Sequence, residues 1–141
     1  MRPTIGYILL PSVIISILYL TFLGHRPDYA GHFMAGFGGT LLMIVTTLEI
    51  QRRKEVPPSS GTIILIVLIA CITFGTLQEA TTFRLAKFDE VDYCNQNIGA
   101  VLAALSSLAV TPKIPEESPV TLPAMIVGLF FLFGGFHYAF Q

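Results

Sequence analysis

Apolar blocks of about twenty residues dominate this chain and limit what it can fold into. Short polar loops separate five such blocks, which cover residues 5–23, 30–50, 62–79, 92–111 and 120–140. A helix rises about 1.5 Å per residue, so about 20 residues cross the roughly 30 Å of hydrocarbon in a bilayer. The pattern therefore predicts an all-α polytopic membrane protein with about five transmembrane helices, in one domain over residues 1–141.

The fourth block departs from this pattern. Its apolar part is only the stretch IGAVLAALSSLAV, and a full span requires the polar run that starts at Asp92. We therefore expect the fourth helix to be short, or polar at its start.

Composition supports a membrane protein and excludes one common class of partner. Hydrophobic residues make up 53% of the chain and charged residues 12%, whereas soluble domains carry about 25% charged residues. The net charge of -1 gives no general attraction for nucleic acid. Membrane lipids are the expected partners. The two cysteines form no CxxC pair, and neither a metal nor a cofactor is predicted.

The distribution of Lys and Arg predicts the orientation, because cytoplasmic loops carry an excess of these residues. With five spans, the N-terminus and the second and fourth loops share one side of the membrane. That side carries five basic residues and the other side three: Arg2, Arg52, Arg53, Lys54 and Lys113, against Arg26, Arg84 and Lys87. We expect a cell or inner membrane location with a cytoplasmic N-terminus and an external C-terminus.

Small residues form ridges on two of the predicted helices. Gly31, Ala35 and Gly39 recur at helical spacing in the second helix, and Gly99 and Ala103 do so in the fourth. Small residues allow helices in a membrane to approach closely, so both ridges are predicted to pack against other helices.

Polar residues near the helix ends are the candidate site. Asp28 and His32 share one face of the second helix, and Asp92 and Gln96 share one face of the fourth. The beginning of the second helix, the end of the third and the beginning of the fourth all lie on one side of the membrane. The topology therefore brings together a candidate polar site of Asp28, His32, Glu79, Arg84, Asp92 and Gln96.

Each of these residues also has a purely structural interpretation. His32 would then bond a neighbouring helix, and Glu79 would extend from a helix end towards the membrane surface. Asp89 or Asp92 would cap the fourth helix, because Asp is a good N-cap and carboxylates suit a helix N-terminus.

The order and spacing of these motifs resemble the VanZ-like membrane proteins, a family named for a teicoplanin-resistance protein. The matching stretches are DYAGHF (28–33), GTLQE (75–79), Arg84 and DYCNQNIG (92–99). The resemblance covers about residues 28–104, within a VanZ-like core of about 28–111, and leaves helices 5–23 and 120–140 unmatched. Thr82 replaces the amide that the family carries after Glu, and Gln96 replaces its Asn four residues after Asp.

The resemblance implies a cell-envelope protein linked to lower sensitivity to lipoglycopeptide antibiotics. The polar residues suit recognition of a lipid or glycopeptide headgroup, in which Arg84 would pair with an anion. Two alternatives stay open: an accessory subunit of a larger membrane complex, and an intramembrane hydrolase or transferase that uses His32, Glu79 and Asp92. The chain contains no HExxH or GxSxG motif, which favours binding over catalysis.

Overall fold

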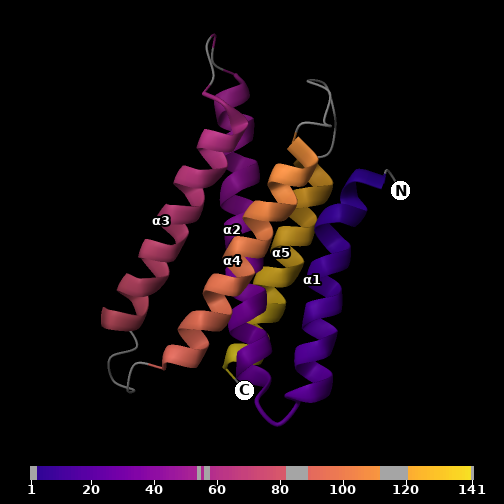
Figure 1. The fold of residues 1–141 in the computed structure, drawn as a ribbon, viewed down its shortest axis with the longest axis vertical. Helices are drawn as coiled ribbons and strands as arrows, with labels where there is room; N and C mark the ends of the chain where they lie inside the picture. The colour runs from indigo at the N-terminus through magenta and orange to yellow at the C-terminus, as the bar shows by residue number, and fades with distance from the viewer. Residues whose placement is uncertain (1–2, 54, 56–57, 82–88, 112–120, 141) are drawn as a thin grey trace.

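The chain forms an up-and-down bundle of helices in a computed structural model (Figure 1). The structure describes residues 3–53, 55, 58–81, 89–111 and 121–140, without the side chains of residues 3–5 and 79. These ranges contain no strand, and each predicted helix begins and ends within three residues of its observed bounds. The all-α prediction is confirmed, with helices α1 (Pro3–Phe22), α2 (Pro27–Arg52), α3 (Ser60–Thr81), α4 (Glu90–Val110) and α5 (Thr121–Ala139).

Three helices in the described part of the chain are long and apolar enough to cross a membrane, which is fewer than the five expected. They are Pro27–Arg52, Ser60–Gln78 and Thr121–Ala139, and they indicate a membrane location. The apolar stretch of α1, Gly6–Phe22, is shorter. The 21 residues of α4 rise about 32 Å, so this helix is long enough, but its first turn carries Glu90 and Asp92.

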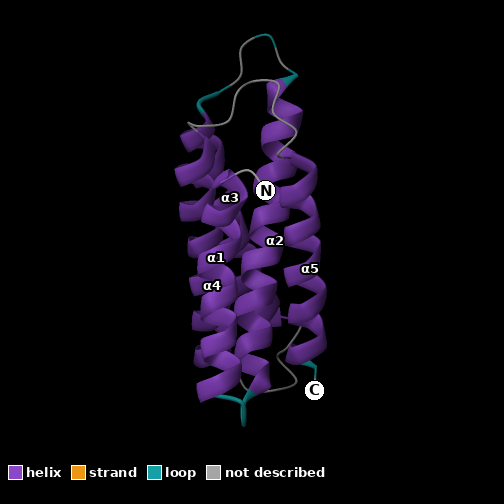
Figure 2. Ribbon diagram, turned by 90° about the vertical axis from the view of Figure 1, so that its right-hand side faces the viewer, coloured by secondary structure: helices purple, strands orange, loops and turns teal. Residues whose placement is uncertain are grey.

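Successive helices run in opposite directions, which sorts their ends into two groups (Figures 1 and 2). One end of the bundle holds the connection from α1 to α2, the beginning of α4 and the end of α5. The opposite end holds the beginnings of α3 and α5 and the end of α2, where Arg52 and Arg53 lie. The ends of α2 and α4 that carry the predicted polar residues are therefore on the same side.

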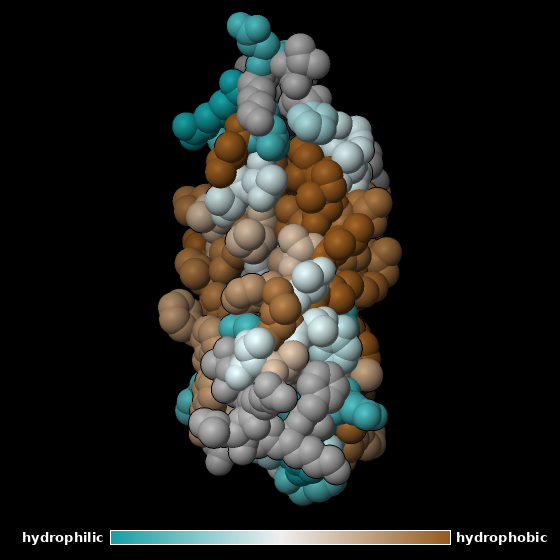
Figure 3. Space-filling view, turned by 90° about the vertical axis from the view of Figure 1, so that its left-hand side faces the viewer, coloured by the Kyte–Doolittle hydropathy of each residue, from teal (hydrophilic) through white to brown (hydrophobic). Residues whose placement is uncertain are grey.

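The surface of the bundle is hydrophobic in the middle and hydrophilic towards the ends, as expected for a protein in a bilayer. Figure 3 shows mostly hydrophobic residues round the middle of one face, with hydrophilic residues towards both ends. Several large apolar side chains of α3 are more than half exposed: Leu65, Ile66, Ile69, Phe74 and Leu77. Exposed apolar side chains in such numbers favour contact with lipid over contact with water.

Helix α2 lies at the centre and supplies more buried apolar side chains than any other helix in the described part of the chain. Its side chains Phe33, Phe37 and Leu41 are fully buried, and Phe131 of α5 is almost so. The rings of Phe37 and Phe131 lie 4.9 Å apart at 55°. In lipid, such contacts stabilise by van der Waals packing, because lipid tails are as apolar as the core.

Glycine allows α5 to approach α2 closely. A Cβ atom at Gly31 would overlap the backbone of Ala139, and one at Gly135 would overlap the backbone of Ala35. At Gly38 a Cβ would come within 2.6 Å of the carbonyl oxygen of Gly128. The ridge of Gly31 and Ala35 therefore faces α5.

A second set of glycines brings α4 against α2. A Cβ at Gly36 would overlap the backbone of Gln96, and one at Gly99 would overlap the carbonyl of Phe33. Ala103, one turn further along α4, is fully buried. Gly39 differs, because a Cβ there would meet only the side chain of Leu132, at an ordinary 3.8 Å.

Candidate functional site

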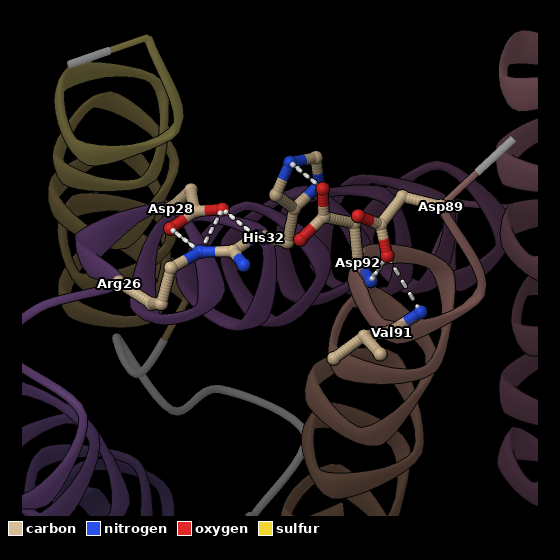
Figure 4. Close-up of polar contacts among 6 residues, drawn as sticks. All are labelled: Arg26, Asp28, His32, Asp89, Val91 and Asp92. Carbon is tan, nitrogen blue, oxygen red and sulfur yellow. Dashed lines mark hydrogen bonds and ion pairs between the residues drawn. The ribbon is translucent and has the colours of Figure 1, made fainter. Parts of the chain in front are cut away.

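An ion pair joins α2 to α4 at one end of the bundle (Figure 4). The polar end is the name used here for a group of seven residues: Arg26, Asp28, His32, Asp89, Glu90, Asp92 and Asn95. Nε2 of His32 lies 3.5 Å from Oδ2 of Asp92. The two side chains are 21% and 16% exposed. The pair is charged only when the imidazole is protonated, so its strength depends on pH.

Asp89, and not Asp92, caps α4. Oδ1 of Asp89 accepts hydrogen bonds from the backbone N–H groups of Val91, at 2.9 Å, and Asp92, at 3.3 Å. Asp is a preferred N-cap because its carboxylate satisfies N–H groups that have no partner in the first turn. The side chain of Asp92 is therefore free to face His32.

Arg26 forms a second polar contact at this end. Its Nη2 donates to Asp28 Oδ2 at 2.8 Å and its Nε contacts both carboxylate oxygens at 3.2 Å. The guanidinium also lies 4.2 Å from the centre of the Tyr29 ring. The hydrogen bond to Asp28 raises the pKa of Arg26 above its ordinary value, so the guanidinium stays charged. Much of its hydrogen-bonding capacity is already used within the protein.

Tyr19 connects α1 to the same region. Its hydroxyl donates a hydrogen bond of 2.7 Å to Oδ1 of Asn95 in α4. Its ring stacks on that of Phe33, with centres 5.5 Å apart and 17° between the planes. Asn95 is only 6% exposed, so α1, α2 and α4 together enclose its amide.

Two buried polar atoms in this region have no hydrogen-bond partner among the residues that the structure describes. They are Oδ1 of Asp92 and Nδ2 of Asn95. Buried polar groups are nearly always paired in proteins, with a side chain, the backbone or water. Among the described residues, an acceptor and a donor are thus left unpaired three residues apart on one helix.

The other predicted site residues are placed differently. The side chain of Gln96 lies between α4 and α3 and covers Gly75. A Cβ atom at Gly75 would come within 2.7 Å of Nε2 of Gln96. Asp28 pairs with Arg26. The side chain of Glu79 and the whole of Arg84 lie outside the described residues.

Sequence reasoning missed several residues of the site: Tyr19, Arg26, Tyr29 and Asn95. Arg26 had a local signal, because it lies two residues before Asp28 at a helix start. Tyr19 had none, because its contact with Asn95 spans 76 residues of sequence. The position of Asn95 on the buried face depends on the rotation of α4, which the interleaved polar residues Asn95, Gln96 and Asn97 leave open.

The charges at the polar end favour some ligands over others. Among its described residues, apart from histidines, there is one arginine against four carboxylates: Arg26, with Asp28, Asp89, Glu90 and Asp92. An anion would be repelled unless another cation met it. No group of three His, Cys, Asp or Glu in the described part of the chain is arranged to hold a metal ion.

Comparison with other proteins gave no further indication of function. No family model, curated protein or solved structure matches the chain.

Proposed function

We propose that this chain is a VanZ-like integral membrane protein of the cell envelope that recognises a lipid or glycopeptide headgroup at its polar end. The observation that carries the proposal is the His32–Asp92 pair, in which side chains from two helices meet at 3.5 Å while both remain partly exposed. Ionisable residues within membrane-spanning segments are costly and commonly mark functional sites. Lipid headgroups are the polar groups that surround the end of a membrane-spanning bundle.

The same proposal includes five spans and an orientation. The length of α4 and the alternation of helix directions support a span for every helix, with the polar first turn of α4 in the headgroup region. Arg52 and Arg53 lie at the end opposite the polar end, and both contact Glu49, at 3.5 and 3.8 Å. Basic residues favour the cytoplasmic side, so the polar end faces outward.

An accessory role in a larger membrane complex is the second candidate. This role is suggested by the exposed aromatic side chains of α5, Phe130 and Phe133, and by Phe140 just after it, each more than two-thirds exposed. Aromatic side chains are enriched in protein interfaces. A stoichiometric partner that co-purifies in mild detergent and is lost in Phe133→Ala would favour this role.

Native mass spectrometry of the purified protein tests headgroup recognition without assuming a ligand. We expect the wild type to retain one lipid of a single headgroup class, and His32→Ala to lose it. His25→Ala is the matched control, because His25 is exposed in the loop before α2. Equal lipid retention in both variants, or a mixture of lipids in the proportions of the membrane, would remove the support for a headgroup site.

A further inference from the structure

The two unpartnered atoms of the polar end are chemically complementary. Oδ1 of Asp92 accepts hydrogen bonds and Nδ2 of Asn95 donates them, and both are buried. Residues three apart on a helix are neighbours, with Cβ atoms about 5–6 Å apart. A single group that donates to one and accepts from the other would satisfy both.

The geometry points to a neutral, hydroxyl-bearing headgroup as the ligand of the polar end, an inference that rests on the proposed function. One hydroxyl donates its hydrogen to Oδ1 of Asp92 and accepts the N–H of Asn95 through a lone pair. The side chain of Asp92 is 16% exposed although its Oδ1 is buried, so a hydroxyl reaches this atom once neighbouring side chains shift.

Charged headgroup chemistries fit these atoms less well. A fully ionised phosphate accepts from Asn95 but has no hydrogen for Asp92, and the neighbouring carboxylates of Asp28 and Asp89 repel it. An ammonium donates to Asp92 but has no lone pair for Asn95.

Tyr19 holds the amide of Asn95 in place. Its hydroxyl donates to Oδ1 of Asn95, which leaves Nδ2 as the amide atom without a partner among the described residues. The stack on Phe33 holds the Tyr19 ring in place. Tyr19 is therefore a positioning residue of the site.

Binding of four short-chain lipids tests the inference on the wild-type protein. The protein is purified in a detergent without sugar groups, because glycoside detergents would compete, and titrated by calorimetry. The probes are glucosyl dioctanoylglycerol and the dioctanoyl forms of phosphatidylglycerol, phosphatidic acid and phosphatidylethanolamine. We expect the glucosyl lipid to bind about tenfold more tightly than the phosphatidic acid and phosphatidylethanolamine lipids, the equivalent of one to two net hydrogen bonds.

Phosphatidylglycerol separates the two sources of hydroxyl, a sugar and a glycerol. Binding equal to that of the glucosyl lipid would assign the hydroxyl to glycerol, and weaker binding would assign it to a sugar. Either result supports the shared chemistry.

Variants locate the interaction. Asp92→Asn and Asn95→Ala should each weaken binding of the glucosyl lipid about five- to tenfold. Asp92→Asn should not weaken binding of phosphatidic acid, because it removes a negative charge. Asn97→Ala is the matched control, because it is an asparagine of the same helix about 200° away from Asn95. It should bind like the wild type.

Three results would overturn the inference, and they differ in whether headgroup recognition also fails. Phosphatidic acid binding as tightly as the glucosyl lipid would contradict the hydroxyl and leave headgroup recognition standing. If none of the four lipids binds, headgroup recognition fails as well. If Asn95→Ala weakens stability but not the preference among lipids, the two atoms hold a structural water and the inference is wrong.

Discussion

Nε2 of His32 lies 3.5 Å from Oδ2 of Asp92, and this pair connects the second turn of α2 to the first turn of α4, two helices that glycines hold in backbone contact. The close approach at Gly36 and Gly99 explains how two short side chains can meet between helices. The packing and the polar contact therefore depend on each other.

We expect the His32–Asp92 contact to appear as an energetic coupling. Unfolding free energies of His32→Ala, Asp92→Ala and the double variant should depart from additivity by about 0.5–1 kcal/mol, because the residues share one interaction and are only partly exposed. Denaturation in detergent at about pH 6 measures this. The control is a cycle of His25→Ala, Asp92→Ala and their double variant, which should be additive because His25 is exposed in the loop before α2. If the His32 cycle is additive as well, the contact is contradicted.

The coupling should also depend on pH. Only a protonated imidazole attracts the carboxylate, and histidines change charge between about pH 5 and 8. Melting curves of the wild type and Asp92→Asn should therefore differ more near pH 5.5 than near pH 8. A constant difference would contradict an ion pair between His32 and Asp92, whose other charged neighbours are Asp89, Asp28 and Arg26.

Two neighbouring glycines of α2 should respond oppositely to the same substitution. Gly36→Ala places a methyl group against the backbone of Gln96 and should destabilise by about 1–3 kcal/mol, since backbone cannot move aside. Gly39→Ala has room and should be neutral or stabilise by up to about 1 kcal/mol, because Ala favours the helix. Thermal unfolding in detergent compares them. Similar effects of the two changes would place α4 elsewhere on α2.

The orientation predicts which ends react with a membrane-impermeant thiol reagent. Single cysteines at Ser59 and His25, both exposed, lie at opposite ends of the bundle in a background without Cys71 and Cys94. In intact cells His25→Cys should react and Ser59→Cys should react only after the membrane is opened. The reverse pattern would invert the orientation, and labelling of both from outside would remove the membrane-spanning arrangement.

The helices could be predicted from sequence because bilayer thickness limits their length. The apolar blocks end where Pro, Gly and charged residues gather, and the observed ends of α2 and α4 follow from local chemistry: Pro27 at the first turn and Asp89 as cap. The number of membrane spans was harder to predict from sequence. The polar first turn of α4 lowers the mean hydropathy of that helix, whether or not the turn lies inside the membrane. Length and apolar character alone identify three spanning helices in the described residues.

The meeting of helix ends was predictable from topology, whereas the choice of partners was not. The topology placed His32 and Asp92 at the same end of the bundle. The rotation of α4 about its own axis then decides that Asp92 faces His32 and that Gln96 faces Gly75. The caps illustrate the same limit. Asp89 and Asp92 suit the N-cap equally by residue type, and only the position of the first helical turn separates them.

Photo-crosslinking with a lipid that carries the reactive group in its headgroup tests the central claim most directly. A glucosyl lipid with a diazirine on the sugar, followed by peptide mass spectrometry, should label the segments 26–32 and 89–96 in the wild type. The same labelling should fall several-fold in Asp92→Asn and stay unchanged in Asn97→Ala. Labelling confined to the apolar faces of α3 and α5, or unaffected by Asp92→Asn, would contradict a headgroup site at the His32–Asp92 pair.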